Sequence, residues 1–169
     1  MHFWALVELE FVTTRAESPS CIPPESRPHQ DALGRVGEGH QAAQDRLGAG
    51  RIFHCMNSIG QMWRAFDMMV ERSMTREVHG GVLADKQFTQ GAIADSYIET
   101  EAANLMRWKA CELFDARQPC GAEANMAKYL AAKASWEAAN ACIQFHGGFG
   151  FACEYDVERK FRETRLYQV

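Results

Sequence analysis

The stretch Gln144–Gly150 has residue types that could hold a nucleotide. Gly147 and Gly148 carry no side chain, so their backbone can come close to a ligand, and the amide of Gln144 can both donate and accept hydrogen bonds. The same residues also have a structural interpretation, in which Gln144 caps a helix and the glycines only make a turn. Taken alone, the stretch favours the turn, and a nucleotide site needs further support.

Two arginines are further candidates for binding. Arg76 comes at the end of a long helical pattern and Arg51 near its beginning. An arginine near a helix C-terminus interacts favourably with the helix dipole without any ligand. Arg51 could equally be an ordinary surface residue. Neither arginine identifies a ligand without its surroundings.

Several other chemistries lack the residues that they need. The sequence has no P-loop, no GxGxxG dinucleotide motif, no HExxH zinc motif and no nucleophile elbow. His54 beside Cys55 and the isolated His79 have no partner at a metal-binding spacing, so we expect packed or solvated histidines. The cysteines form no CxxC pair and match no zinc pattern, which predicts free thiols in a reducing compartment. They stand at positions 21, 55, 111, 120, 142 and 153.

The composition favours a soluble globular protein. Of the 169 residues, 47% are apolar and 24% are charged, which excludes a disordered or membrane class. A formal net charge of −4 gives no general attraction to nucleic acid or to anionic lipid. No apolar run approaches the ~18 residues of a membrane span, and Glu8 and Glu10 interrupt the N-terminal apolar stretch, so a secretory signal is not expected.

The first part of the chain differs from the rest. Residues 3–14 are compatible with one or two strands, and residues 15–40 contain four of the five prolines and several glycines, a composition typical of a loop. From residue 41 a helical pattern begins, which Gly48 and Gly50 are expected to interrupt or bend. An apolar stripe then predicts a buried helix face. It consists of Ile52, Cys55, Met56, Ile59, Met62, Trp63, Phe66, Met69 and Val70.

Three more helices follow a break at residues 76–87. We expect a helix over about 85–115, one over about 122–145 and a short one over about 156–167. The stripe of the first of these is Phe88, Ala94, Tyr97, Ile98, Ala102, Leu105, Trp108 and Leu113. The helix over 122–145 is rich in alanine, which lets neighbouring backbones approach closely. Long helices joined by short loops predict an antiparallel bundle.

The glycine stretch and the residues after it resemble the signature near the C-terminus of acyl-CoA dehydrogenases. That signature has Gln, two residues, Gly-Gly, a residue and Gly, then a helix start with aromatic-Pro-Val-Glu, and later an Arg-Asp and an Ile-Tyr-containing segment. The corresponding segments here are Gln144–Gly150, Tyr155–Glu158, Arg162–Glu163 and Leu166–Tyr167.

Two earlier segments support the resemblance. Arg76–Leu83 followed by Gln87 is similar to the family's Arg-x-x-Phe-Gly-x-x-Leu with a Gln eleven residues after the Arg. Leu47–Arg51 is similar to the Leu-Asp-x-x-Arg segment that opens the first long bundle helix. The similarity spans about residues 33–169, and the order of the segments and the gaps between them agree.

The resemblance implies an all-α fold, an antiparallel up-down helical bundle. Residues 41–169 would form the C-terminal four-helix bundle domain, and residues 1–40 an irregular leader compatible with a remnant of the middle β-domain. The resemblance also implies FAD as the cofactor, bound partly by a neighbouring subunit. The implied cofactor-binding residues are Arg76, His79, Gln87, Gln144, His146, Gly147 and Gly148, and Arg51 would lie by the substrate. An arginine at position 76 would make charge-assisted bonds to a pyrophosphate.

The implied activity is FAD-dependent α,β-dehydrogenation of an acyl-CoA thioester to a trans-2-enoyl-CoA. In the family a carboxylate takes the α-proton and the flavin takes the β-hydride. The implied partners are the acyl-CoA substrate, an electron-transferring flavoprotein and further copies of the chain in a homodimer or homotetramer. We expect a cytoplasmic protein, or one of the mitochondrial matrix in a eukaryote.

The chain departs from the family at the catalytic base. The Glu that serves in many members follows the segment that Leu166–Val169 resembles, and the alternative position on the first bundle helix matches Gly50, which cannot accept a proton. No residue of the chain is therefore assigned as catalytic, and we expect the isolated chain to be inactive. Gly48 replaces the Asp of the substrate segment, His79 replaces a Phe, and Asp156 replaces a Pro but is a good N-cap. The competing hypothesis is a non-catalytic helical oligomerisation module or an inactive gene fragment.

Overall fold

The computed structural model describes Arg35 and residues 37–169. The strands predicted in residues 3–14 and most of the predicted loop at 15–40 lie outside the described residues. The chain divides into two compact units, Met1–Gly48 and Ala49–Val169, with the boundary inside the first long helix. The bundle lies in the second unit.

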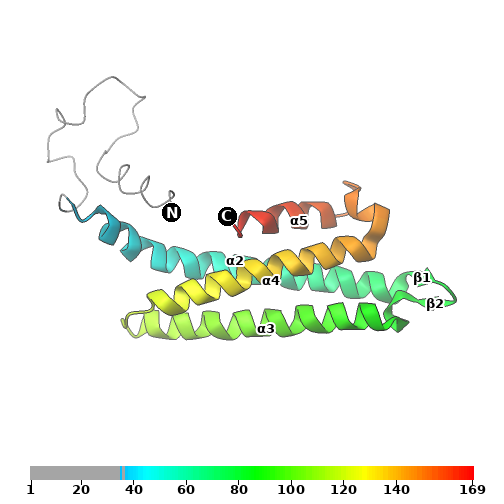
Figure 1. The fold of residues 1–169 in the computed structure, drawn as a ribbon, viewed down its shortest axis with the longest axis horizontal. Helices are drawn as coiled ribbons and strands as arrows, with labels where there is room; N and C mark the ends of the chain where they lie inside the picture. Colours follow the sequence, from blue (N-terminus) through cyan, green and yellow to red (C-terminus); the bar gives the residue numbers. More distant parts are fainter. Residues whose placement is uncertain (1–34, 36) are drawn as a thin grey trace, which may run out of the picture. The chain divides into compact units, whose positions relative to one another are not determined.

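The element order is that of an up-down helical bundle. It runs α2 (Gly39–Thr75), β1 (Glu77–Val78), β2 (Gly81–Val82), η3 (Leu83–Asp85), α3 (Gln87–Asp115), α4 (Gly121–His146), η4 (Gly147–Phe151) and α5 (Val157–Leu166). Within the second unit the long helices lie side by side and alternate in direction, and α5 returns along α4 (Figure 1). The predicted all-α antiparallel bundle is confirmed.

The helix α2 is longer than the sequence pattern indicates. It begins at Gly39 and continues through Gly48 and Gly50 to Thr75. The expectation that these glycines interrupt the helix is wrong, because a glycine in a helix interior costs only about 1 kcal/mol relative to alanine. Among the described residues, no helix is long and apolar enough to cross a membrane.

The break between α2 and α3 is a short β-hairpin, which the sequence did not predict. Glu77 pairs with Val82 and Val78 with Gly81 in antiparallel register. The two residues of the loop, His79 and Gly80, have positive φ angles of 49° and 80°. A two-residue hairpin loop with positive φ at both positions matches the right-handed twist of the strands. Strands of two residues are too short to show an alternating pattern.

The core of the bundle forms three clusters along its length. At the hairpin end, Met69 of α2 packs with Cys142 and Phe145 of α4 and with Val157 of α5. The middle cluster contains Cys55, Ile59, Ala103, Ala127 and Ala131. At the far end the cluster consists of Ile52, Ala110 and Ala124. Most of the predicted stripe of α2 therefore faces the core, whereas Met56 is 42% exposed and Val70 is only partly buried.

The helices α3 and α4 pack through small residues. The buried positions of α3 are Thr89, Ser96, Thr100, Ala103 and Ala110. The large apolar residues that mark α3 as a helix lie instead on its exposed side, where Ile98, Leu105 and Trp108 are 63%, 68% and 54% exposed. The apolar stripe of α3 is thus not the face that packs in the bundle. Small side chains occupy the interface between α3 and α4, where they permit a close approach of the two helices.

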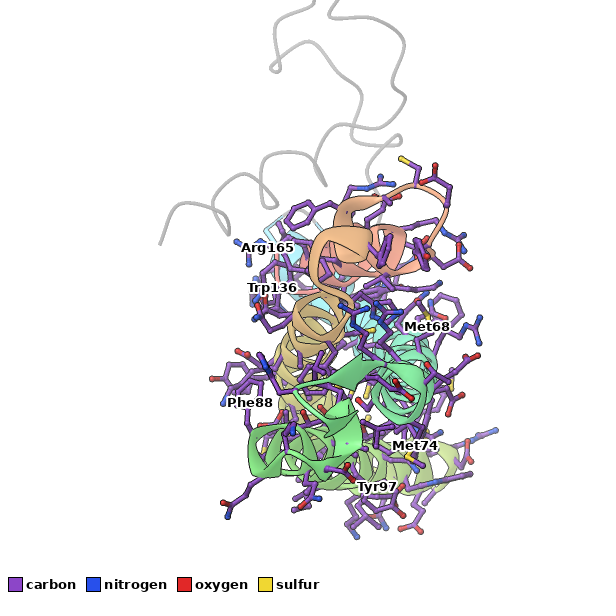
Figure 2. The ribbon with its side chains drawn as sticks, turned by 90° about the vertical axis from the view of Figure 1, so that its right-hand side faces the viewer. Met68, Met74, Phe88, Tyr97, Trp136 and Arg165 are labelled. Carbon is purple, nitrogen blue, oxygen red and sulfur yellow. The ribbon has the colours of Figure 1, made fainter. Side chains whose placement is uncertain are left out.

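The helix α5 packs along α4, and this packing determines the position of the connecting turn η4. The ring of Trp136 lies 4.3 Å from that of Phe161, centroid to centroid. The guanidinium of Arg165 lies over the ring of Trp136, 5.3 Å from its centroid (Figure 2). Lys128 donates a hydrogen bond to the carbonyl oxygen of Tyr167. Together with the packing of Val157 against Met69 and Cys142, these contacts join both ends of α5 to the bundle.

Candidate functional site

A cavity of about 530 Å³ lies at the end of the bundle where α2, the hairpin, α3 and η4 meet. Figure 2 looks onto this end, with the hairpin in front and Phe88 labelled at the start of α3. The lining residues come from α2, the hairpin, η3, α3 and the junction of α4 with η4. They are Arg72, Arg76, Val78, Leu83, Phe88, Gln144, Phe145, His146, Gly147, Gly148 and Phe149.

The cavity brings together most of the residues singled out from the sequence. Arg76 and the run from Gln144 to Gly148 are 68 positions apart in the chain but line the same space. Among the described residues that line it, none is an Asp or a Glu. Two arginines, a glutamine and two exposed glycines therefore line one cavity, and no carboxylate residue is among its described lining. This arrangement suits an anion.

The position of Arg76 is fixed by its backbone. Its amide donates to the carbonyl oxygen of Arg72 at 2.9 Å, which completes the last turn of α2. Its own carbonyl oxygen accepts a hydrogen bond of 2.7 Å from the amide of Leu83, which follows the hairpin. Arg76 thus stands where helix and hairpin join, and its side chain is exposed.

The glycines of η4 differ in what they do. Gly147 has a φ of 59°, which a side chain disfavours, and its amide donates back to carbonyl oxygens of the last turn of α4. A Cβ on Gly150 would lie 2.9 Å from the carbonyl oxygen of Ile143. A Cβ on Gly148 would meet nothing within 4 Å. The turn therefore explains Gly147 and Gly150, but it does not require a glycine at 148.

His146 forms a buried wall of the cavity. Its Nδ1 lies 2.8 Å from the carbonyl oxygen of Cys142, one turn earlier, so Nδ1 carries a hydrogen and donates it. The ring of Tyr155 lies 6.2 Å from the imidazole, centroid to centroid. Burial raises the pKa of the Cys142 thiol to about 12, so this cysteine stays protonated and unreactive at neutral pH.

One lining residue of interest was missed in the sequence. Arg72 lies in the last turn of α2, four positions before Arg76, which directly follows the helix, and both residues line the cavity. The helical period could have found it once Arg76 was chosen. Its guanidinium lies over the ring of Phe149, 5.3 Å from the centroid, and its Nε is buried without a hydrogen-bond partner.

Three of the candidate residues do not line the cavity. His79 is at the tip of the hairpin, beside a separate hollow formed by residues 77–82. Gln87 is the first residue of α3 and is exposed, while its neighbour Phe88 does line the cavity. Arg51 is on α2, about 37 Å from Arg76 at a rise of 1.5 Å per residue. The structure thus separates Arg51 from the other candidates.

The described residues contain no group of three His, Cys, Asp or Glu side chains placed to hold a metal ion. The cysteines among them, Cys55, Cys111, Cys120, Cys142 and Cys153, are free thiols. His54 is exposed, and its ring lies 6.0 Å from that of Phe53 and 6.3 Å from that of Tyr167.

Comparisons with known proteins agree on one family. Residues 37–169 match the family described as "Acyl-CoA dehydrogenase, C-terminal domain". The chain is 34% identical over 142 residues to the caffeyl-CoA reductase–Etf complex subunit CarC of Acetobacterium woodii, a match that covers 84% of this chain and 38% of that protein. It is 32% identical to the human mitochondrial short-chain specific acyl-CoA dehydrogenase, covering 84% of this chain and 34% of the relative.

Solved structures give the same result for the fold. The bundle superposes on the butyryl-CoA dehydrogenase of Megasphaera elsdenii with a TM-score of 0.78 and 29% identity, covering 84% of this chain and 37% of that one. The chain thus spans between a third and two-fifths of the length of these relatives.

Proposed function

This chain belongs to the acyl-CoA dehydrogenase family, and from that premise we propose that its bundle serves as the cofactor-holding helical domain of an FAD-dependent enzyme. The reaction is the α,β-dehydrogenation of an acyl-CoA thioester to a trans-2-enoyl-CoA. The observation that supports the proposal is the cavity that gathers Arg76, Gln144 and Gly148 at one end of the bundle.

The residues of the cavity fit the pyrophosphate and adjoining parts of FAD. Arg76 is positioned to make charge-assisted hydrogen bonds to phosphate oxygens, and no lining carboxylate among the described residues competes for it. Gln144 can donate to or accept from a nucleotide through its amide. Gly148 leaves its backbone accessible to a close ligand, and Phe88 and Phe145 supply an apolar wall. When bound, the flavin supplies the hydride acceptor.

The distance between Arg51 and this cavity bears on the assembly. The two are about 37 Å apart along α2. In this proposal Arg51 contacts the acyl-CoA of one active site, and the cavity holds the FAD of another, so a complete site uses two copies of the chain. A homodimer or homotetramer follows, and electrons leave to an electron-transferring flavoprotein. The relative CarC is itself named as a subunit of an Etf complex.

The proton acceptor of the reaction does not come from the cavity, since no lining residue among those described is a carboxylate. The 169-residue chain alone is therefore expected to show no oxidation of butyryl-CoA with an artificial electron acceptor. Turnover by the isolated chain would contradict this assignment of roles.

The cofactor role is tested by titrating the chain with ADP, the part of FAD that carries the pyrophosphate. Arg76→Gln is expected to weaken ADP binding about tenfold, the effect of about 1.4 kcal/mol in a charge-assisted contact. Arg64→Gln is the matched control, because Arg64 is an exposed arginine of the same helix that does not line the cavity. Equal affinity of both variants for ADP would refute the role of Arg76.

A second function, a helical oligomerisation module without a catalytic role, is favoured by one observation. Ile98, Leu105 and Trp108 form an exposed apolar stripe on α3, and exposed apolar patches promote association. Size-exclusion chromatography with and without FAD separates the two functions. An oligomer that changes with FAD supports the cofactor domain, whereas assembly indifferent to FAD supports the module.

A further inference from the structure

Arg72 lies in the last turn of α2, Arg76 directly follows the helix four positions later, and both line the same cavity. Like charges at this spacing repel each other. No lining carboxylate among the described residues offsets the two charges. An anion between the two arginines, or beside both, would offset the repulsion between their positive charges.

The guanidinium of Arg72 is held in place before any ligand binds. It lies over the ring of Phe149, 5.3 Å from the centroid, and the adjoining ring of Tyr155 lies 5.2 Å from that of Phe149. A cation over an aromatic face is attracted by the ring. Phe149 belongs to η4, so the same turn that presents Gly148 to the cavity also orients Arg72.

The Nε of Arg72 is buried and has no hydrogen-bond partner in the structure. A buried donor without a partner is unfavourable, and arginine cannot remove the penalty by losing its proton. The helix dipole explains a positive charge in the last turn of α2. It does not explain a planar group stacked on Phe149 with a buried donor, since a lysine would serve the dipole equally well.

We propose that Arg72 and Arg76 form a two-arginine clamp that selects a ligand with two adjacent phosphoryl groups over one with a single phosphoryl group. The inference rests on the proposed cofactor role of the cavity and assigns Arg72 to it. Arg76 contacts one phosphoryl group from the exposed side, and Arg72 contacts the other from the inner side. The planar donors of arginine suit two neighbouring phosphate oxygens better than the point charge of lysine does.

The experiment compares the affinities of the 169-residue chain for ADP and AMP by calorimetry. The wild type is expected to bind ADP at least about tenfold more tightly than AMP, as an additional charge-assisted contact gives. Arg72→Gln is expected to weaken ADP binding about tenfold and AMP binding less than about threefold. Arg72→Lys, which keeps the charge, and Phe149→Leu, which removes the ring, are both expected to reduce the preference for ADP. Arg64→Gln is the control and should leave it unchanged.

Three outcomes would overturn the clamp. If Arg72→Gln keeps the wild-type preference for ADP, Arg72 has no part in binding while the proposed function stands. If Arg72→Lys keeps the wild-type preference for ADP, a positive charge at position 72 is sufficient, and a clamp that needs two planar guanidinium groups is excluded. If the wild type binds neither nucleotide, the cofactor role and the clamp fail together. Melting curves without ligand show whether Arg72→Gln is folded; if it is not, the comparison of Arg72→Lys and Phe149→Leu with the wild type decides the test.

Discussion

Replacing Gly150 by alanine tests how η4 is built. Gly150 is a buried residue of η4, the turn that follows α4. A Cβ there would lie 2.9 Å from the carbonyl oxygen of Ile143, 3.1 Å from its Cγ2 and 3.2 Å from its Cα. Two of these atoms belong to the backbone of α4, so no side-chain rotation can relieve the crowding. The turn would have to move away from the helix.

The expected loss follows from overpacking a well-filled site, which costs about 1–3 kcal/mol. For a chain of this length, each kcal/mol lowers the melting temperature by about 2–4 °C, so Gly150→Ala should melt roughly 2–12 °C below the wild type. Gly148→Ala is the matched control, because its Cβ would meet nothing within 4 Å. Its stability should stay within about 1 kcal/mol of the wild type.

In ADP binding, by contrast, Gly148→Ala is the variant that we expect to differ from the wild type. If the backbone at Gly148 touches the nucleotide, Gly148→Ala should weaken ADP binding about tenfold, or 1.4 kcal/mol. Thermal unfolding followed by circular dichroism gives the first comparison, and calorimetric titration with ADP gives the second. Wild-type stability of Gly150→Ala would refute the packing argument. Wild-type ADP affinity of Gly148→Ala would exclude a close contact between the nucleotide and the backbone at position 148.

Other variants probe the core and the thiols. Met69→Ala should lower the free energy of unfolding by about 2–5 kcal/mol, because Met69 is fully buried. Met74→Ala should change it by less than about 0.5 kcal/mol, because Met74 is 61% exposed. Equal losses for the two variants in urea denaturation would contradict the assignment of Met69 to the core. In alkylation followed by peptide mapping, the exposed Cys153 should react at pH 8 and the buried Cys142 should not. The pKa of Cys142 is raised from 9.0 to about 12, so its neutral thiol stabilises the fold below pH 9, and this contribution is lost as pH rises from 9 to 12. Unfolding midpoints of Cys142→Ala should therefore fall less steeply over that range than those of the wild type, and parallel slopes would exclude the effect.

The sequence predicted the number and approximate limits of the helices because their apolar period extends over many turns. The observed α3 and α4 begin and end within about two residues of the expected positions. The period did not reveal which face of α3 is buried. Ile98 and Leu105 repeat at helical spacing as buried residues do, yet they are exposed. Only the alanine content of α4 indicated that small residues would fill the interface.

The candidate site was predictable as far as its glycines and Arg76, because each belongs to a recognisable segment. The structure brings these segments to one cavity. It leaves His79 and Gln87 outside the lining, since a tight loop holds one at the hairpin tip and the other stands one residue before Phe88. Arg72 escaped notice because the role of a residue inside a helix depends on what packs over it, here Phe149.

The alanine face of α4 has a consequence for tolerance to mutation. Ala127, Ala131, Ala134 and Ala138 are all less than 5% exposed. An alanine at a close helix contact can be enlarged only by separating the helices, and interiors are packed too densely to absorb even one added methylene without strain. In a saturation screen for stability, the most sensitive positions of this bundle should therefore include its smallest side chains. Conspicuous residues such as Leu105 should accept polar replacements, so the usual ranking of positions by hydropathy would be inverted.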